Sequence, residues 1–184
     1  MARVFVITGP SGVGKGTLIA ALRERHPELD LAVSATTRPP RPGEQDGVAY
    51  HFLTEADFAR RLERGEFVEH ADYAGHRYGT LRAELERRTR SGAPVVLEIE
   101  LQGARQIRVA LPDAVLIFIA PASPEQLRER LAQRGADDPA TVERRLAIAQ
   151  TELAARDEFR HVVVNDDLET AASKLAEIYT QYAE

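Results

Sequence analysis

The run from Gly9 to Thr17 holds the residues best suited to chemistry: Gly-Pro-Ser-Gly-Val-Gly-Lys-Gly-Thr. It follows an apolar stretch at residues 4–8 that is typical of a buried strand, and it opens a predicted helix from Lys15 to about Arg25. In that context the glycines let backbone N–H groups converge on phosphate oxygens, the helix N-terminus adds positive potential, and Lys15 reaches the β- and γ-phosphates. The pattern predicts a P-loop; the alternative is a glycine-rich turn without a ligand.

The position after the lysine departs from the general P-loop motif. The motif has Ser or Thr there, whose hydroxyl binds Mg²⁺, whereas this chain has Gly16 followed by Thr17. We therefore expect the ion to be held mainly by phosphate oxygens and water, which suits Mg²⁺ because it loses water reluctantly. The variant points toward small-molecule kinases and away from GTPase switches.

Arginines gather at two further places. Arg38 and Arg41 lie on a loop that its prolines keep from forming a regular helix, and two arginines on a rigid loop suit bidentate phosphate binding. Arg130 and Arg134 are four residues apart and share a helix face, and Arg145 follows in the next predicted helix. Converging arginines stabilise the charge of a transferring phosphoryl group. The alternative for the second group is a solvated helix surface.

Four nearly continuous apolar runs predict buried strands at residues 4–8, 94–99, 114–119 and 161–165. Strands that are continuously apolar are covered on both faces, which favours a parallel sheet. Helices are expected at residues 15–25, 81–91, 102–110, 124–134, 139–157 and 168–182. This alternation predicts an α/β fold with three layers.

The segment from residue 34 to residue 80 has a different character. It is rich in proline, glycine, arginine and aromatic residues, and it lacks a long apolar run. Within it, residues 67–73 and 76–78 flank Ala74-Gly75, a pattern that predicts a hairpin around a glycine turn. We interpret the segment as a small β-rich insertion on the α/β core.

The bulk composition fits one globular domain of 184 residues, 43% hydrophobic and 29% charged. The absence of cysteine excludes disulfides, thiolate zinc sites and cysteine nucleophiles, and the five histidines show no metal-ligand spacing. A net charge of −5 argues against nucleic-acid binding, and no apolar run approaches the roughly 18 residues of a membrane helix. We expect a cytoplasmic protein that binds neither nucleic acid nor membrane and shows no obligatory protein partner.

With the P-loop and the insertion considered together, the chain resembles the guanylate kinase family essentially end to end. The most specific match is Ser-x-Thr-Thr-Arg-x-x-Arg-x-Gly-Glu at residues 34–44, and further matches lie at residues 47–52, 65–67, 78–80, 98–104 and 164–167. The resemblance implies a P-loop NTPase core with three αβα layers (residues 1–33, 81–125 and 151–184), a GMP-binding subdomain (34–80) and a helical lid (126–150). It also implies the reaction ATP + GMP → ADP + GDP in purine metabolism, with Mg²⁺ as cofactor and dGMP as a second substrate.

The same resemblance implies roles for individual residues, each carried over by its place in a matching stretch. The GMP phosphate falls to Arg38, Arg41, Tyr50 and Tyr78, and the guanine ring to Ser34, Glu69 and Thr80, with Glu100 nearby where the family usually has aspartate. The ATP site falls to Gly9, Pro10, Ser11, Gly12, Val13, Gly14, Lys15, Gly16, Thr17 and Asn165. Catalysis falls to Lys15 with Arg38, Arg130, Arg134 and Arg145, and Glu98 orients Mg²⁺ through water.

Purely structural or surface roles stay open for several of these residues. The tyrosines are alternatively packing residues, Glu98 a plain strand-end carboxylate, and Asn165 a cap of a turn. Glu69 lies in an alternating strand, so its alternative is a solvent-facing position.

The chemistry of guanine supports the role of Glu69 independently. Guanine presents two adjacent donors, N1–H and the exocyclic amino group, to which one fixed carboxylate can bind, whereas adenine has an acceptor at N1. A site built on such hydrogen bonds can reject the wrong base by roughly 10⁴-fold.

Two rival functions remain. One is another small-molecule kinase on the same scaffold, and Ser34, Glu69 and Thr80 argue against it. The other is a non-catalytic protein-binding module, and the intact Lys15 argues against it.

Overall fold

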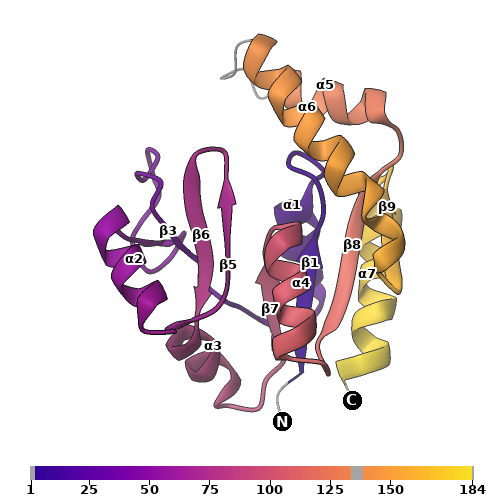
Figure 1. The fold of residues 1–184 in the computed structure, drawn as a ribbon. Helices are drawn as coiled ribbons and strands as arrows, with labels where there is room; N and C mark the ends of the chain where they lie inside the picture. The colour runs from indigo at the N-terminus through magenta and orange to yellow at the C-terminus, as the bar shows by residue number, and fades with distance from the viewer. Residues whose placement is uncertain (1–2, 134–138, 184) are drawn as a thin grey trace. The chain divides into compact units, whose positions relative to one another are not determined.

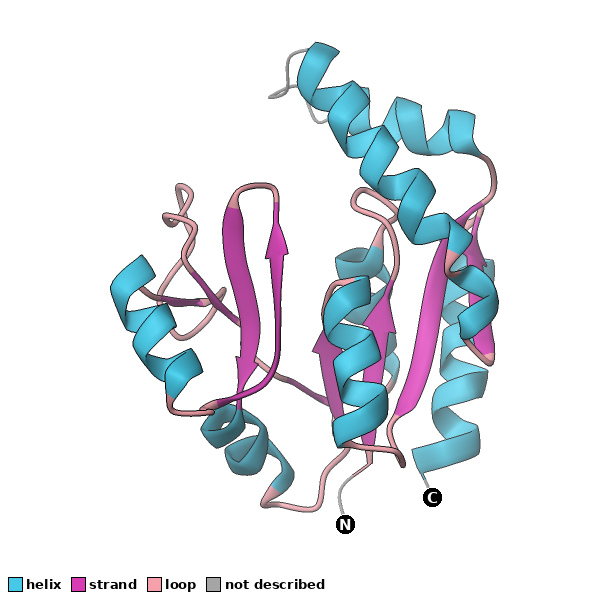
Figure 2. Ribbon diagram, in the orientation of Figure 1, coloured by secondary structure: helices cyan, strands magenta, loops and turns pink. Residues whose placement is uncertain are grey.

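The computed structural model describes residues 3–133 and 139–183. Strands and helices alternate along most of the chain, as Figure 1 shows by element and Figure 2 by colour. The chain divides into two compact units, one made of residues 3–6 and 28–115 and the other of residues 7–27 and 116–183. None of the helices in the described ranges is long and apolar enough to cross a membrane.

The larger sheet has the strand order β2-β7-β1-β8-β9. In the first unit β2 (Asp30–Leu31) pairs in parallel with β7 (Val95–Glu98), and in the second unit β8 (Val115–Pro121) pairs in parallel with β9 (His161–Asn165). The strand β1 (Val4–Thr8) contributes residues to both units. Since the side chains of Val6, Ile7, Val96 and Phe118 are fully buried, the prediction of a parallel α/β sheet covered on both faces is confirmed.

A second sheet in the first unit has the order β4-β3-β6-β5. Its strands are β3 (Ala35–Thr36), β4 (His51–Phe52), β5 (Phe67–Tyr73) and β6 (His76–Leu81). Helix α2 (Glu55–Glu63) begins where the hydroxyl of Thr54 accepts a hydrogen bond from the Asp57 amide. Phe58 of this helix stacks on Phe67 beside Ala35, which forms a small apolar core for the sheet.

The hairpin of β5 and β6 turns at Ala74 and Gly75, as predicted. Both residues have positive φ, 50° and 81°, which is the conformation of a two-residue turn whose twist matches that of the flanking strands. The pairing places Glu69 opposite Thr80 and His70 opposite Gly79, after a register shift between Phe67 and Glu69. Two helices complete this unit: α3 (Arg82–Thr89) and α4 (Leu101–Ala110), of which α4 packs against β5.

In its described residues the second unit is built on β8 and β9 with five helical segments. Helix α1 (Lys15–Arg25) buries Leu18, Ile19 and Leu22, the face predicted to be apolar, and packs against α7 (Leu168–Ala183). Helices α5 (Pro124–Gln133) and α6 (Pro139–Ala154) pair through a separate apolar cluster, and a 3₁₀ turn (Arg156–Glu158) follows. That cluster is formed by Leu127, Leu131, Leu146 and Ala149.

Some predicted boundaries need correction. The helix expected at residues 139–157 ends at Ala154, and the chain then tightens into the 3₁₀ turn. At the start of α5 the Gln126 amide donates to the Ser123 hydroxyl, and the Gln126 side chain accepts from the amide of Ala122. The two-residue strands β2, β3 and β4 were not predicted from the sequence.

Candidate functional site

The loop at residues 9–14 has the backbone that the glycine pattern predicts. Gly9, Gly12 and Gly14 all have positive φ, at 141°, 83° and 96°. A Cβ on Gly9 would collide with the carbonyl oxygen of Ile119 in β8, so no other residue fits without moving that strand. The loop therefore has the form of a P-loop, and Gly14 leads directly into α1.

Lys15 is turned back onto this loop. Its side chain is buried, and Nζ donates to the carbonyl oxygens of Gly9 (2.6 Å) and Pro10 (3.2 Å). Gly16 and Thr17 in the first turn of α1 are exposed. The backbone of the loop thus holds the Lys15 ammonium in place, and this is the loop that we expect to bind the phosphates.

Two arginines from α5 and α6 also reach this loop. Arg130 donates to the carbonyl oxygens of Val13 (3.1 Å) and Asn165 (3.0 Å). Arg145 donates to the hydroxyl of Ser11 at 2.6 Å. Both side chains therefore lie at the loop that is predicted to bind phosphate, and their role there stays a prediction. The third arginine of this group, Arg134, lies outside the described residues.

Asn165 at the end of β9 is buried and braces the same loop. Its side-chain amide donates to the carbonyl oxygen of Val13 at 2.7 Å, and a Cβ on Gly14 would lie 2.5 Å from that amide nitrogen. This contact favours the structural alternative for Asn165, that it holds a turn; its contact with adenine stays a prediction.

In the first unit, Arg38 lies among aromatic rings and one carboxylate. It forms a two-pronged ion pair with Glu44, with distances of 3.0 and 2.9 Å, and its guanidinium lies 5.2 Å from the ring centre of Tyr50. This pairing raises the pKa of Arg38 and lowers that of Glu44. Glu44 also accepts from the backbone amide of Arg41, whose side chain is exposed. Glu44 ends the specific sequence stretch, yet the sequence assigned it no role.

The tyrosines predicted to contact phosphate lie together. The rings of Tyr50 and Tyr78 meet edge to face with centres 6.1 Å apart. Burial raises the pKa of the Tyr50 hydroxyl, and the nearby charge of Glu98 raises it further, so the hydroxyl stays a hydrogen-bond donor. Ser34 lies just before β3, where its carbonyl oxygen accepts from the His51 amide.

Glu69 is almost fully buried, which excludes the solvent-facing alternative. Its exposed fraction is 2%, and Oε1 accepts from the Thr80 hydroxyl at 2.7 Å. Burial raises the pKa of this carboxyl to about 7, although hydrogen bonds from Thr80 act against the rise and the charge of Glu100 adds to it. The structure thus holds a poorly compensated carboxylate next to Thr80, the pair that the sequence predicted for guanine.

Glu100 occupies the cap position of α4 without capping it. Its side chain makes no hydrogen bond to the helix N-terminus, and Oε2 is buried with no hydrogen-bond partner in the described part of the chain. A shorter aspartate side chain is the common capping residue at such a position. Glu100 therefore leaves the N-terminal amides of α4 without a side-chain cap.

Three residues to which the sequence assigned no role contact the backbone or side chains in this part of the first unit. Gln106 binds the backbone of His70, Gly103 lies against Glu69, and Glu84 accepts from the Val33 amide. An isolated glycine inside a helical pattern is the one local signal among them, because it often marks a close approach. The others depend on contacts between distant segments.

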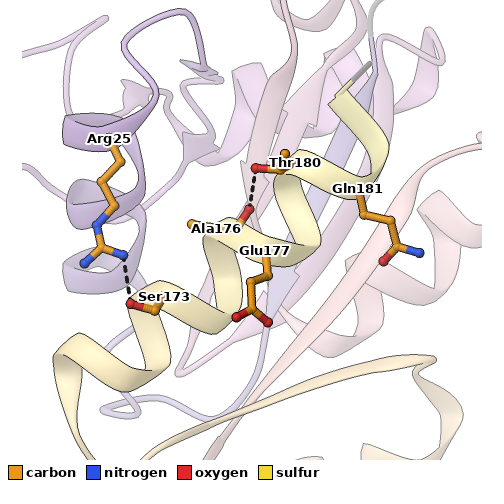
Figure 3. A pocket seen from close by; sticks show the side chains of 6 residues that line it. All are labelled: Arg25, Ser173, Ala176, Glu177, Thr180 and Gln181. Atoms are coloured by element: carbon orange, nitrogen blue, oxygen red, sulfur yellow. Dashed lines mark hydrogen bonds between the residues drawn. The ribbon is translucent and has the colours of Figure 1, made fainter.

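A separate groove lies along α1 and α7 (Figure 3). Its lining includes none of the predicted site residues that lie in the described ranges. Arg25 in its wall donates to the Ser173 hydroxyl at 3.2 Å and to Glu169 at 2.6 Å, so its charge is engaged within the protein. We therefore assign the groove no role in the reaction.

Comparison with known proteins extends the resemblance. A family model described as guanylate kinase matches residues 1–182. The guanylate kinase of Frankia casuarinae is 56% identical over 170 residues, covering 92% of both chains, and that of Synechococcus sp. strain CC9311 is 54% identical, covering 95% of this chain and 92% of its own. The crystal structure of guanylate kinase from Anaplasma phagocytophilum superimposes with a TM-score of 0.81 at 32% identity, covering 99% of this chain and 86% of that one. Both the fold and the sequence show that this chain belongs to the guanylate kinase family, the ATP-dependent kinases of GMP.

Proposed function

We propose that the residues described above carry out ATP + GMP → ADP + GDP, with dGMP as a second acceptor and Mg²⁺ bound to ATP. The observation that carries the assignment is the buried Glu69 beside Thr80, because its hydrogen-bond partners there are neutral. The two adjacent donors of guanine fit such a carboxylate, and a base without them leaves it buried and unsatisfied.

The phosphates of the two nucleotides fall to separate groups of residues. The loop amides and Lys15 bind the β- and γ-phosphates of ATP, with Arg130 and Arg145 joining as the γ-phosphoryl group transfers. Arg38, Arg41, Tyr50 and Tyr78 hold the GMP phosphate as the nucleophile. Arginine and neutral hydroxyl donors act together by placing positive potential where charge develops, so no nucleophilic side chain is required.

Mg²⁺ would bind in this scheme mainly through phosphate oxygens and water. The described residues contain no group of three or more His, Asp or Glu side chains placed to grip a metal. The carboxylate of Glu98 suits this hard cation through a bridging water, and an ion that keeps several waters needs few protein ligands. When bound, it neutralises the phosphate charge that the arginines also face.

We further propose that the protein acts in the cytoplasm within purine metabolism, where both nucleotides are supplied. In this proposal residues 126–150 form a lid. Its closing, together with that of the subdomain at residues 34–80, would exclude water from the transferring phosphoryl group.

The test is a coupled assay of ADP release with ATP and Mg²⁺, offering GMP, AMP, CMP and UMP separately. Turnover with GMP alone supports both the reaction and the base selection. In Glu69→Gln we expect a large loss of kcat/KM for GMP with a nearly unchanged KM for ATP, because the amide offers guanine a donor where it needs an acceptor. Glu63→Gln, the same change on the exposed end of α2, is the matched control.

Other outcomes would contradict the proposal in distinct ways. Preference for another acceptor would keep the kinase but overturn the role of Glu69. No turnover with any acceptor, in folded protein that still binds GMP, would indicate a binding module.

A further inference from the structure

Helix α4 packs against β5, the strand that carries Glu69 (Figure 1). Two of the α4 residues that meet this strand have no assigned role. Strand β5 is the outer strand of its sheet, so one edge of its backbone lacks a neighbouring strand among the residues that the structure describes. Unpaired N–H and C=O groups on such an edge need other partners. Gln106 and Gly103 of α4 meet this edge at His70 and Glu69.

Gln106 acts toward His70 as a neighbouring strand would. Its Oε1 accepts from the His70 amide at 3.1 Å, and its Nε2 donates to the His70 carbonyl oxygen at 2.6 Å. A primary amide has both a donor and an acceptor, so one side chain satisfies both backbone groups. Because a further bond from Nε2 to the Gln102 carbonyl oxygen (3.3 Å) ties the amide to its own helix, the backbone next to Glu69 is fixed relative to α4.

Gly103 provides the space into which the Glu69 carboxylate extends. A Cβ at position 103 would collide with Oε2 of Glu69, while Oε1 on the other side is held by Thr80. The carboxylate is therefore confined between a hydroxyl and a helix backbone. Glycine in a helix interior costs about 1 kcal/mol relative to alanine, and here the close approach explains its presence.

We propose that Gln106 and Gly103 are positioning residues that set the Glu69 carboxylate for guanine and thereby determine base selection. The inference rests on the proposed function, since it takes Glu69 to be the residue that binds the base. Displacing a binding group by about 1 Å can cost roughly 100-fold in rate, so the loss of either contact has a measurable effect.

The first experiment replaces Gln106 by methionine, which keeps the length and apolar packing of the side chain but neither hydrogen bond. The matched control is Gln102→Met, the same change on an exposed side chain one turn earlier in the helix. We expect kcat/KM for GMP to fall about 10- to 100-fold in Gln106→Met, with KM for ATP within about twofold of wild type. The control should match wild type.

Base selection separates a positioning role from a general structural one. Inosine monophosphate lacks the exocyclic amino group, so the ratio of kcat/KM for GMP over this analogue measures the contact of Glu69 with that group. We expect this ratio to fall at least about fivefold in Gln106→Met. An unchanged ratio, with equal losses for both nucleotides, would overturn the proposal for Gln106.

The second experiment is a double-mutant cycle between Gly103→Ala and Glu69→Ala. If the added methyl acts by displacing the carboxylate, Gly103→Ala costs more than about tenfold in kcat/KM for GMP with Glu69 present and less than about threefold without it. Equal costs in the two backgrounds would refute the role of Gly103. Thermal unfolding and KM for ATP show whether each variant is folded.

Different results would contradict the role of Glu69 and the positioning roles of Gln106 and Gly103. If Glu69→Gln leaves base selection intact, the proposed role of Glu69 is wrong. If Glu69→Gln abolishes selection while Gln106→Met and Gly103→Ala preserve it, only the present inference is wrong.

Discussion

Lowering the pH from 8 to 6 should weaken the use of GMP far more than the use of ATP. The reason is the pKa of Glu69, which burial raises to about 7 in spite of the hydrogen bonds from Thr80. Only the ionised carboxylate can accept hydrogen bonds from both donors of guanine, because the protonated form carries a proton of its own. Acid therefore removes, within an accessible pH range, the form of Glu69 that we propose binds GMP.

The magnitude follows from competition between a proton and GMP for the same carboxylate. With a pKa of about 7, the apparent KM for GMP is close to its limiting value at pH 8 and rises about tenfold at pH 6. A carboxyl with an ordinary pKa of about 4.3 would change KM by only a few per cent over the same range. The second ionisation of the GMP phosphate, near pH 6, adds about twofold.

The assay measures initial rates across pH 5.5 to 8.5, varying GMP at saturating ATP and then ATP at saturating GMP. Glu69→Gln is the control for the phosphate, since it keeps the twofold effect of GMP ionisation and loses the tenfold effect of the carboxyl. Calorimetry in buffers of different ionisation enthalpy gives a second readout. At pH 6.5 the binding of GMP should release about three quarters of a proton more from wild type than from the variant.

A KM for GMP that is equally pH-dependent in wild type and Glu69→Gln would refute this reasoning. It would mean that Glu69 is ionised throughout the range, or that it does not contact the base. A parallel rise in KM for ATP would instead point to a general effect of pH on the fold.

Two further predictions concern stability. Burial pushes the pKa of Glu84 upward, but hydrogen bonds from Arg87, the Val33 amide and Arg88 outweigh it and bring the pKa down to about 2. A lowered pKa stabilises the native state above about pH 4.5, and that contribution is lost as the pH falls toward 2. Glu84→Gln should thus lower the free energy of unfolding by about 1–3 kcal/mol at pH 7 and by less near pH 3, as urea titrations at both pH values would show; an undiminished gap would exclude this origin. Gly9→Ala and Gly92→Ala both place alanine at an unfavourable positive φ, but only the methyl at position 9 also collides with Ile119. Gly9→Ala should therefore destabilise the protein by more than the roughly 1–2 kcal/mol expected for Gly92→Ala. Equal losses in thermal unfolding would argue against the collision.

Strands and helices with a strong local pattern could be predicted almost to the residue. The strand at Val4–Thr8, the helix at Lys15–Arg25 and the strand at His161–Asn165 agree with the structure at both ends. Each is an apolar run or an amphipathic face bounded by residues that stop it. The strands at Ala35–Thr36 and His51–Phe52 have only two residues each, too few for any periodicity. They form because β3 pairs with β6 on one side and with β4 on the other.

The candidate site divides in the same way. Lys15 and its loop are contiguous in sequence, so their chemistry is visible without the fold. Glu69 and Thr80 could be paired because the hairpin between them has a recognisable turn. Gln106 could not, since its partner His70 lies 36 residues away and its role depends on the packing of a helix against an edge strand.

The charged groups of the site differ in what substrate binding must replace. Lys15 is held by two backbone carbonyl oxygens, and Arg38 is held by Glu44. If these residues bind phosphate as we propose, the phosphate must exchange for these partners, which reduces the net gain from each contact. Glu69 is different, since Thr80 provides its hydrogen bonds and the neighbouring charge that raises its pKa is the like charge of Glu100. If Glu69 binds the base as we propose, guanine adds hydrogen bonds there without displacing an ion pair. For this reason discrimination between nucleotides should be concentrated at the base, while the phosphate contacts serve every nucleotide alike.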